Sequence, residues 1–204
     1  MIQKMTTVLA IAIAGSATGQ AVTGFSGGSE FAIFYGGSTG DVVGWRFDVN
    51  TSIILTDIGV WNADNQITPG LTSNHRVGLW DSGGNLLTAG SAGPGDPSVG
   101  DWNYGNVADV VLVPGERYTI GAMYSATDDD GYVSSPASIA LASEINATTN
   151  GVFPPAGDLG FVFPTEDSTN LARLGPNFLF SPIPAPASAV LLGLGGLAAT
   201  RRRR

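Results

Sequence analysis

The sequence predicts an antiparallel all-β domain with an export segment before it and a membrane-directed tail after it. Gly, Asn, Asp and Pro interrupt the chain about every ten residues, and no stretch between the two ends has the period of an amphipathic helix. Apolar and polar residues instead alternate along short segments. These observations favour a β-sandwich over residues 22–181, with a signal peptide at 1–21 and a sorting segment at 182–204.

The first segment has the order of a secretory signal peptide, which directs a chain to the Sec machinery. Lys4 is the only charge ahead of the apolar run 8–14, and small residues follow that run. Gly19 and Ala21 satisfy the requirement for small side chains at a cleavage site, so we expect the mature chain to begin near Val22. A short buried core helix is the alternative, but it does not explain why the cation comes first.

Alternation predicts the first strands of the domain. Residues 43–49 alternate between large apolar side chains and Gly, Arg or Asp, which gives one apolar and one mostly polar face. Residues 54–61 predict the next strand. Later strands are expected near Phe161 and Phe178.

Two hairpins are predicted between these strands. Residues 76–81 and 86–88 flank a Gly-rich turn, and residues 107–113 and 117–125 flank a Pro-Gly-Glu turn. The predicted apolar face of the last of these strands holds Tyr118, Ile120, Ala122 and Tyr124.

A Gly-x-Trp pattern occurs twice, at Gly59–Trp61 and at Gly78–Trp80. Because side chains alternate across a strand, each Trp shares a face with the Gly two residues before it. The missing side chain leaves room for the indole to lie over the backbone. We expect both rings to seal a face of a sheet.

The segments VVGWRF, DIGVWN, HRVGLWDSGGNLL and LVPGERYTIGAMY follow one another in an order that resembles DUF4082-like β-sandwich domains of secreted bacterial proteins. The resemblance covers about residues 42–125 and implies a jelly-roll-like sandwich. It implies no settled activity, since a fold does not define a function.

The tail combines three features in a fixed order. A proline-rich stretch precedes a Gly-, Ala- and Leu-rich run over 187–200, and a cluster of arginines ends the chain. As a helix the apolar run would be about 21 Å long at ~1.5 Å per residue, short of the ~20 residues that usually cross a hydrocarbon core. The arginines would stay on the cytoplasmic side. The tail therefore predicts transient membrane contact, with a plain single-pass anchor as the alternative.

This order resembles the PEP-CTERM sorting signal, in which a Pro-Glu-Pro motif, an apolar helix and a basic cluster are read by a membrane transpeptidase called exosortase. The matching residues here are Pro184, Ala185, Pro186, Arg201, Arg202, Arg203 and Arg204, with Ala185 where the family usually has Glu. The resemblance implies that an exosortase-type transpeptidase removes the tail, much as a GPI signal is removed. The protein would then be left at the cell surface or in the extracellular matrix after transient anchoring in the inner membrane.

Composition excludes one class of partner. Of the 9 basic residues only four arginines lie within 22–186, together with all 17 acidic residues, so the formal charge of this region is −13. Such a surface repels nucleic acid and anionic lipid, and favours solubility or divalent cations. The chain has no Cys, so its core depends on apolar packing without disulfides.

Three kinds of site remain to be weighed. His75 is the sole His, and we expect it to be solvated or hydrogen-bonded at the start of its strand, although any Ser-His-Asp site would have to use it. The carboxylates of Asp128, Asp129 and Asp130 precede a Gly and would suit Ca²⁺, although their spacing is not that of an EF-hand. A solvated acidic loop is the simpler interpretation of this run, and no other cofactor is expected.

Aromatic rings provide the third kind of site. Trp102 and Tyr104 lie in a Gly-, Asp- and Asn-rich segment, 100–106, which we expect to be a loop that exposes them. Flat rings with polar edges suit sugars, so the pair is a candidate glycan-binding site, with a packing role as the open alternative.

The sequence therefore favours an exported, non-enzymatic surface or extracellular-matrix protein that is processed at its C-terminal signal. A carbohydrate-binding module for exopolysaccharide or cell-wall glycan is the alternative. A hydrolase with paired carboxylates ranks third, because the sequence places no two acids at the required separation.

Overall fold

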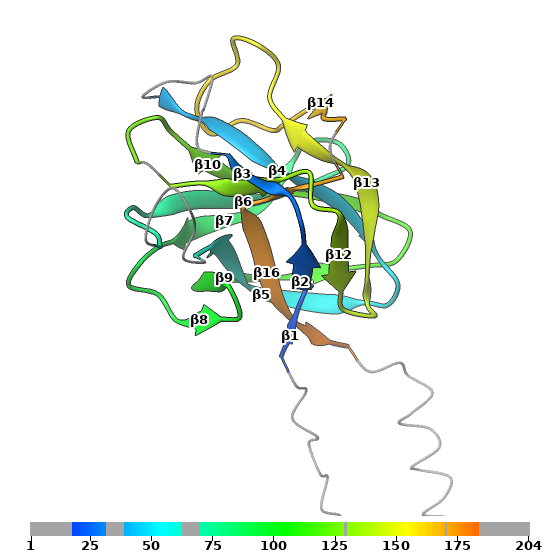
Figure 1. The fold of residues 1–204 in the computed structure, drawn as a ribbon. Coiled ribbons are helices and arrows are strands. Elements are labelled where there is room, and N and C mark those ends of the chain that lie inside the picture. The colour runs from blue at the N-terminus through cyan, green and yellow to red at the C-terminus, as the bar shows by residue number, and fades with distance from the viewer. Residues whose placement is uncertain (1–17, 32–38, 63–69, 129, 170, 184–204) are drawn as a thin grey trace, which may run out of the picture.

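The computed structural model of the chain describes residues 18–31, 39–62, 70–128, 130–169 and 171–183. In this part the structure has sixteen β-strands, β1 to β16, and its antiparallel sheets pack against each other (Figure 1). The predicted all-β, sandwich-like class is therefore confirmed. The apolar run of the export segment and the sorting motif lie outside the described residues.

Two large sheets form the sandwich, and two small ones border it. The first large sheet has the order β1 (Gly19–Gln20), β16 (Pro176–Pro182), β5 (Ile53–Trp61), β9 (Trp102–Leu112) and β8 (Ser98–Val99). The second has the order β14 (Glu166–Asp167), β13 (Ile145–Phe153), β4 (Asp41–Val49), β10 (Arg117–Tyr124), β6 (His75–Asp81) and β7 (Leu86–Ala92). The small sheets are β15 (Arg173–Leu174), β11 (Tyr132–Ser134) and β3 (Ser29–Phe31), and β12 (Ser138–Leu141) with β2 (Val22–Ser26).

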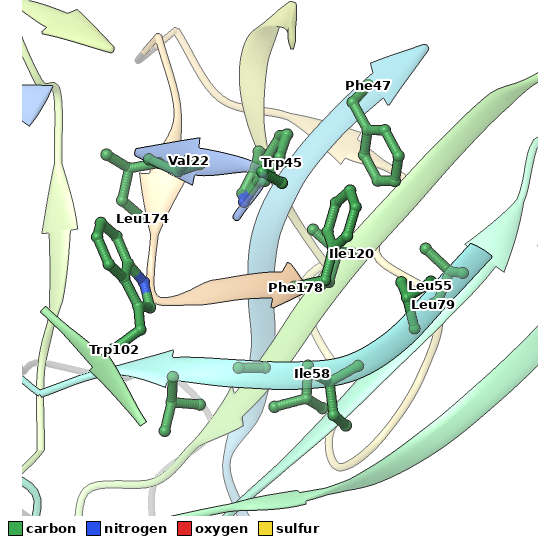
Figure 2. Packing of buried hydrophobic residues seen from close by; sticks show 14 of the residues in the cluster. Val22, Trp45, Phe47, Leu55, Ile58, Leu79, Trp102, Ile120, Leu174 and Phe178 are labelled. Carbon is green, nitrogen blue, oxygen red and sulfur yellow. The ribbon is translucent and has the colours of Figure 1, made fainter. Parts of the chain in front are cut away.

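The core lies between the two large sheets. The apolar residues at alternate positions of β4 are at most 3 % exposed, which confirms the predicted inward face of this strand. Phe178 of β16 meets them from the other sheet, with its ring centroid 4.8 Å from that of Phe47 and 6.2 Å from that of Trp45 (Figure 2). Trp45 Nε1 also donates a hydrogen bond to the carbonyl of Pro176 at 2.9 Å. These contacts join the two sheets.

β6 and β7 form the predicted hairpin. The residues between them include Gly84 at a φ of 80°, a region that glycine adopts without steric cost. Asp81 Oδ1 accepts hydrogen bonds from the backbone N–H groups of Gly83 and Asn85, both at 2.9 Å. Hydrogen bonds from Asn85 lower the pKa of Asp81, so the ionised carboxylate holds the turn in place.

β9 and β10 do not form the second predicted hairpin. β9 pairs with β5 and β8, whereas β10 pairs with β4 and β6. The turn at residues 113–116 therefore crosses from one large sheet to the other, and the hairpin prediction is wrong. The inward face predicted for β10 is confirmed, because Tyr118, Ile120, Ala122 and Tyr124 are all at most 4 % exposed.

The two Gly-x-Trp patterns have different outcomes. A Cβ on Gly78 would lie 2.7 Å from the rings of Trp80 and Phe161, so the absent side chain makes room for the indole as predicted. Phe161 belongs to the segment between β13 and β14, and the strand predicted near it is wrong. At Gly59 the neighbouring ring, 2.6 Å from a Cβ, is that of Tyr104 on the adjacent strand.

The two ends of the described chain lie together. β1 is the edge strand beside β16, with Gly19 opposite Phe180. Because the two strands are antiparallel, the start of β1 lies beside the end of β16 (Figure 1). The chain therefore enters and leaves the sandwich at the same end.

Candidate functional site

Buried polar groups gather at the start of β6. His75, the first residue of that strand, is 1 % exposed. Its Nδ1 lies 3.0 Å from the carbonyl oxygen of Met123, and its Nε2 lies 2.8 Å from Asp130 Oδ2. A carbonyl and an ionised carboxylate both accept, so both contacts are hydrogen bonds when the imidazole carries two protons. The expected hydrogen-bonded His is confirmed, and one of its partners is a buried carboxylate.

Asp130 connects this imidazole to the loop that precedes β6. It is also 1 % exposed, and it accepts hydrogen bonds from the backbone N–H groups of Thr72 at 2.7 Å and Ser73 at 2.9 Å. Burial acts to raise the pKa of Asp130, but the hydrogen bonds from His75, Thr72 and Ser73 outweigh burial and hold the pKa below its usual value. The ionised carboxylate therefore ties the segment after β10 to the loop before β6.

Tyr124 and Asp128 complete the surroundings of the imidazole. The ring centroid of Tyr124 lies 4.4 Å from that of His75. Burial, together with the charges of Asp130 and Asp128, raises the pKa of the Tyr124 phenol well above its ordinary value. Asp128 Oδ2 accepts a hydrogen bond from the Ser125 N–H at 2.9 Å and lies 3.9 Å from His75 Nδ1. Both ring nitrogens of the imidazole are thus engaged by the protein itself.

The acidic run after β10 is divided by the fold. Asp130 points inward to the imidazole and Asp128 caps its own turn, while Asp129 lies outside the described residues. Among the residues with described positions, no three His, Cys, Asp or Glu side chains form a group that could hold a metal ion. Ca²⁺ binding by this run stays a prediction, with two of its carboxylates already engaged by the protein.

The serine motif G-x-S-x-G, which carries the nucleophile in some hydrolases, occurs twice in the sequence, but the described copy does not lie on a strand-to-helix turn. Residues 24–28 read G-x-S-x-G, and so do residues 36–40. In α/β-hydrolases this pattern places a serine on a strand-to-helix turn. Ser26 instead ends β2, and its Oγ lies 2.7 Å from Ser138 Oγ on β12. Ser38 lies outside the described residues.

The candidate glycan-binding rings lie inside the sandwich. Trp102 is 1 % exposed and Tyr104 is 3 % exposed, so the expectation of an exposed loop is wrong. Both residues belong to β9, which pairs with β5 and places Trp102 opposite Trp61. Phe25 meets both indoles edge-on, with ring centroids 6.0 Å from Trp102 and 6.3 Å from Trp61. The rings of Trp102 and Tyr104 are therefore part of the core and present no exposed face to a sugar.

A pocket that the sequence did not indicate lies beside the start of β4. It has a volume of about 410 Å³, and it is lined by Asp41, Phe153, Pro154, Pro155, Ala156, Gly157, Asp158 and Leu159. Asp41 is 8 % exposed, and its Oδ1 has no hydrogen-bond partner in the structure. Burial raises the pKa of Asp41, although the charge of Arg173 acts in the opposite direction. The sequence does contain a signal for the burial of Asp41. Side chains alternate along a strand, so position 41 lies on the same inward face as the odd-numbered residues of 43–49.

The structure does not describe the positions of the sorting-motif residues. Pro184, Ala185, Pro186 and the four terminal arginines lie outside the described residues. In the part of the chain with described positions, no helix is long and apolar enough to span a bilayer.

Comparisons with known proteins assign no family to this arrangement. No protein-family model matches the chain, and a search of curated proteins finds no matching relative. The residues and their geometry therefore carry the functional conclusion.

The buried carboxylates of Asp130 and Asp41 should respond in opposite ways to the same substitution. Asp130→Asn removes a buried carboxylate that accepts hydrogen bonds from Thr72, Ser73 and His75, and should lower the free energy of unfolding at pH 7 by about 3 kcal/mol. Asp41→Asn removes a buried charge that lacks a partner for Oδ1, and should raise it by about 1 kcal/mol. Urea titrations of both variants and of the unchanged protein measure these differences.

The pH dependence of both effects follows from the two pKa directions. The folded-state pKa of Asp130 is depressed, so its stabilisation is present above the unfolded-state value of about 3.9 and is lost as pH falls through the folded-state value. The folded-state pKa of Asp41 is raised, so its destabilisation is present at neutral pH and disappears on acidification. Equal effects of both variants at pH 7 would contradict this assignment.

The buried position of Trp102 predicts a large loss of stability on truncation. Trp102→Ala should lower the free energy of unfolding by about 3 to 5 kcal/mol, because it leaves a cavity in the core. Val111→Ala is the matched control, since Val111 lies on the same strand at 57 % exposure and should change stability by less than about 0.5 kcal/mol. Similar unfolding midpoints for the two variants would show that the ring is exposed in solution.

Proposed function

We propose that this chain is an exported, non-enzymatic bacterial protein of the cell surface or extracellular matrix, with a jelly-roll-like sandwich that is released by removal of its C-terminal tail. The observation that carries the proposal is the common exit of the two chain ends. β1 and β16 are antiparallel neighbours, so the export segment and the tail both leave from one end of the sandwich (Figure 1). A domain held at that end would direct the rest of its surface away from the membrane.

The position of the tail supports its removal after folding. The last strand ends at Pro182, and the Ile183 N–H donates a hydrogen bond to the carbonyl of Ser52 at 3.0 Å. The proline motif begins one residue later, at Pro184. A transpeptidase that cuts within or after this motif would therefore disturb no strand pairing. The exosortase-type enzyme and the Sec machinery are the partners of this proposal, and membrane contact is transient.

The engaged imidazole supports a non-enzymatic role. His75 holds two parts of the chain together through Met123 and Asp130. A triad that used Asp130 as its acid would still have to break the contact with Met123, because its serine would need that ring nitrogen. The carbohydrate alternative has lost the exposed rings that motivated it, because Trp102 and Tyr104 fill the core.

The arginine cluster should be required for removal of the tail. Replacing Arg201–Arg204 with serines removes the charges that hold the segment on the cytoplasmic side. We expect the processed form to be lost, and intact mass of the protein from its native host should then include the C-terminal residues. Ala185→Glu restores the family's usual motif and should leave processing intact.

Arg117→Ser is the matched control for this experiment, since Arg117 is an exposed arginine at 54 % side-chain exposure that pairs with Asp48 at the surface. It should leave both the processed mass and the location of the protein unchanged. Unchanged protein that still ended in Arg204 and stayed in the cytosol would overturn the proposal.

A further inference from the structure

The folded sandwich begins before Val22. In β1, a Cβ on Gly19 would lie 2.7 Å from the ring of Phe180, so the glycine lets the strand lie directly against that ring. The Gln20 side chain donates hydrogen bonds to Tyr104 Oη at 2.8 Å and to the carbonyl of Val99 at 3.3 Å. These two residues are thus part of the first large sheet.

Ala21 is the next residue and is fully buried. Its N–H donates a hydrogen bond to the carbonyl of Phe178 at 3.0 Å, and its carbonyl accepts one from the N–H of Ala142 at 3.0 Å. Ala21 therefore connects the central strand β16 to the segment that follows β12. Removal of this residue would leave both of those buried backbone groups without a partner.

The backbone nitrogen of Val22 is the least suitable place for a chain terminus. Val22 and Asn177 are both 0 % exposed. The Val22 N–H donates to Asn177 Oδ1 at 3.0 Å, and Asn177 Nδ2 donates back to the Val22 carbonyl at 2.9 Å. A cut before Val22 would turn this N–H into an α-amino group that is mostly ionised at pH 7. Burying an ammonium against one acceptor, in place of water, is strongly unfavourable.

We infer that the export segment is cut after Ala17, so that the mature chain begins at Thr18. Thr18 is exposed, and an ammonium there stays in water. Gly15 and Ala17 have the small-x-small spacing that cleavage requires. This inference rests on the proposed export of the protein. It moves the start of the mature chain four residues ahead of Val22, the start expected from the sequence, and keeps the whole of β1.

Cuts closer to Val22 do not preserve these contacts. Ala17 and Gly19 also have the required spacing, but a cut after Gly19 would remove half of β1 and its pairing with Phe180. The cut after Ala17 leaves every described contact of β1 in place.

The first test is the N-terminal sequence and intact mass of the full chain after export by its native host. A first residue of Thr18 is the expected result. A later first residue, including Val22, would overturn the assigned cut while leaving export standing. A first residue of Met1 on protein that remains in the cytosol would overturn the export proposal itself, and with it this inference.

Two substitutions in the full chain test the assigned bond directly. Ala17→Leu places a bulky side chain next to the cut and should abolish the form that begins at Thr18. Ser16→Leu is the matched control, because it adds the same side chain at the middle position, where the small-x-small pattern has no requirement, and should preserve the Thr18 start. Unchanged mature protein from Ala17→Leu, in both first residue and yield, would overturn the inference.

Discussion

The packing of Phe178 against Trp45 and Phe47 is the interaction on which the rest of the structure depends. The chain has no Cys, so no disulfide joins the two large sheets, and these ring contacts hold them together with the hydrogen bond from Trp45 to Pro176. Aromatic pairs of this kind contribute about 0.5 to 1.5 kcal/mol each beyond the burial of their area. Because Phe178 lies in β16, these contacts fix the strand to which β1 is paired and from which the tail departs. The core thereby determines where both ends of the chain leave the domain.

The two ends are not equivalent with respect to cleavage. On the C-terminal side, β16 is complete before the proline motif begins, so a cut within or after that motif would leave the described strand pairing in place. On the N-terminal side, Gln20 and Ala21 make side-chain and backbone hydrogen bonds within the sandwich, and Asn177 is paired with the next residue. A cut just beyond the end of β16 would leave its pairing in place. A cut inside β1, the neighbouring strand, would remove hydrogen bonds of the sandwich. Position in the sheet, rather than distance from the chain end, decides which cut the fold accepts.

Seven of the sixteen described strands could be predicted because their signal is local; they are β4, β5, β6, β7, β9, β10 and β16. Alternation over 43–49 reports one buried face, and a Gly-rich turn between two short apolar segments reports a hairpin. The partner of a strand is not a local property. The turn at 113–116 has the local sequence of a hairpin turn, yet it connects strands of two different sheets. The loop predicted around Trp102 from composition is wrong for the same reason. Gly and Asn around it resemble a loop, but pairing with β5 turns them into strand, and Gly59 provides the space that the ring of Tyr104 fills.

The polar residues around His75 and Asp130 were also hard to predict, because their partners are distant in the sequence. A run of acidic residues indicates a solvated loop, because sequence alone does not show which N–H donors a carboxylate will meet. Asp130 meets those of Thr72 and Ser73, and the ring of His75, all more than fifty residues away along the chain. Asp41 is buried as well, yet its Oδ1 meets no donor, and the two carboxyl groups have pKa values shifted in opposite directions. Burial alone therefore does not determine the cost of an acidic side chain in this domain. That cost depends on how many hydrogen-bond donors the fold places around each carboxylate.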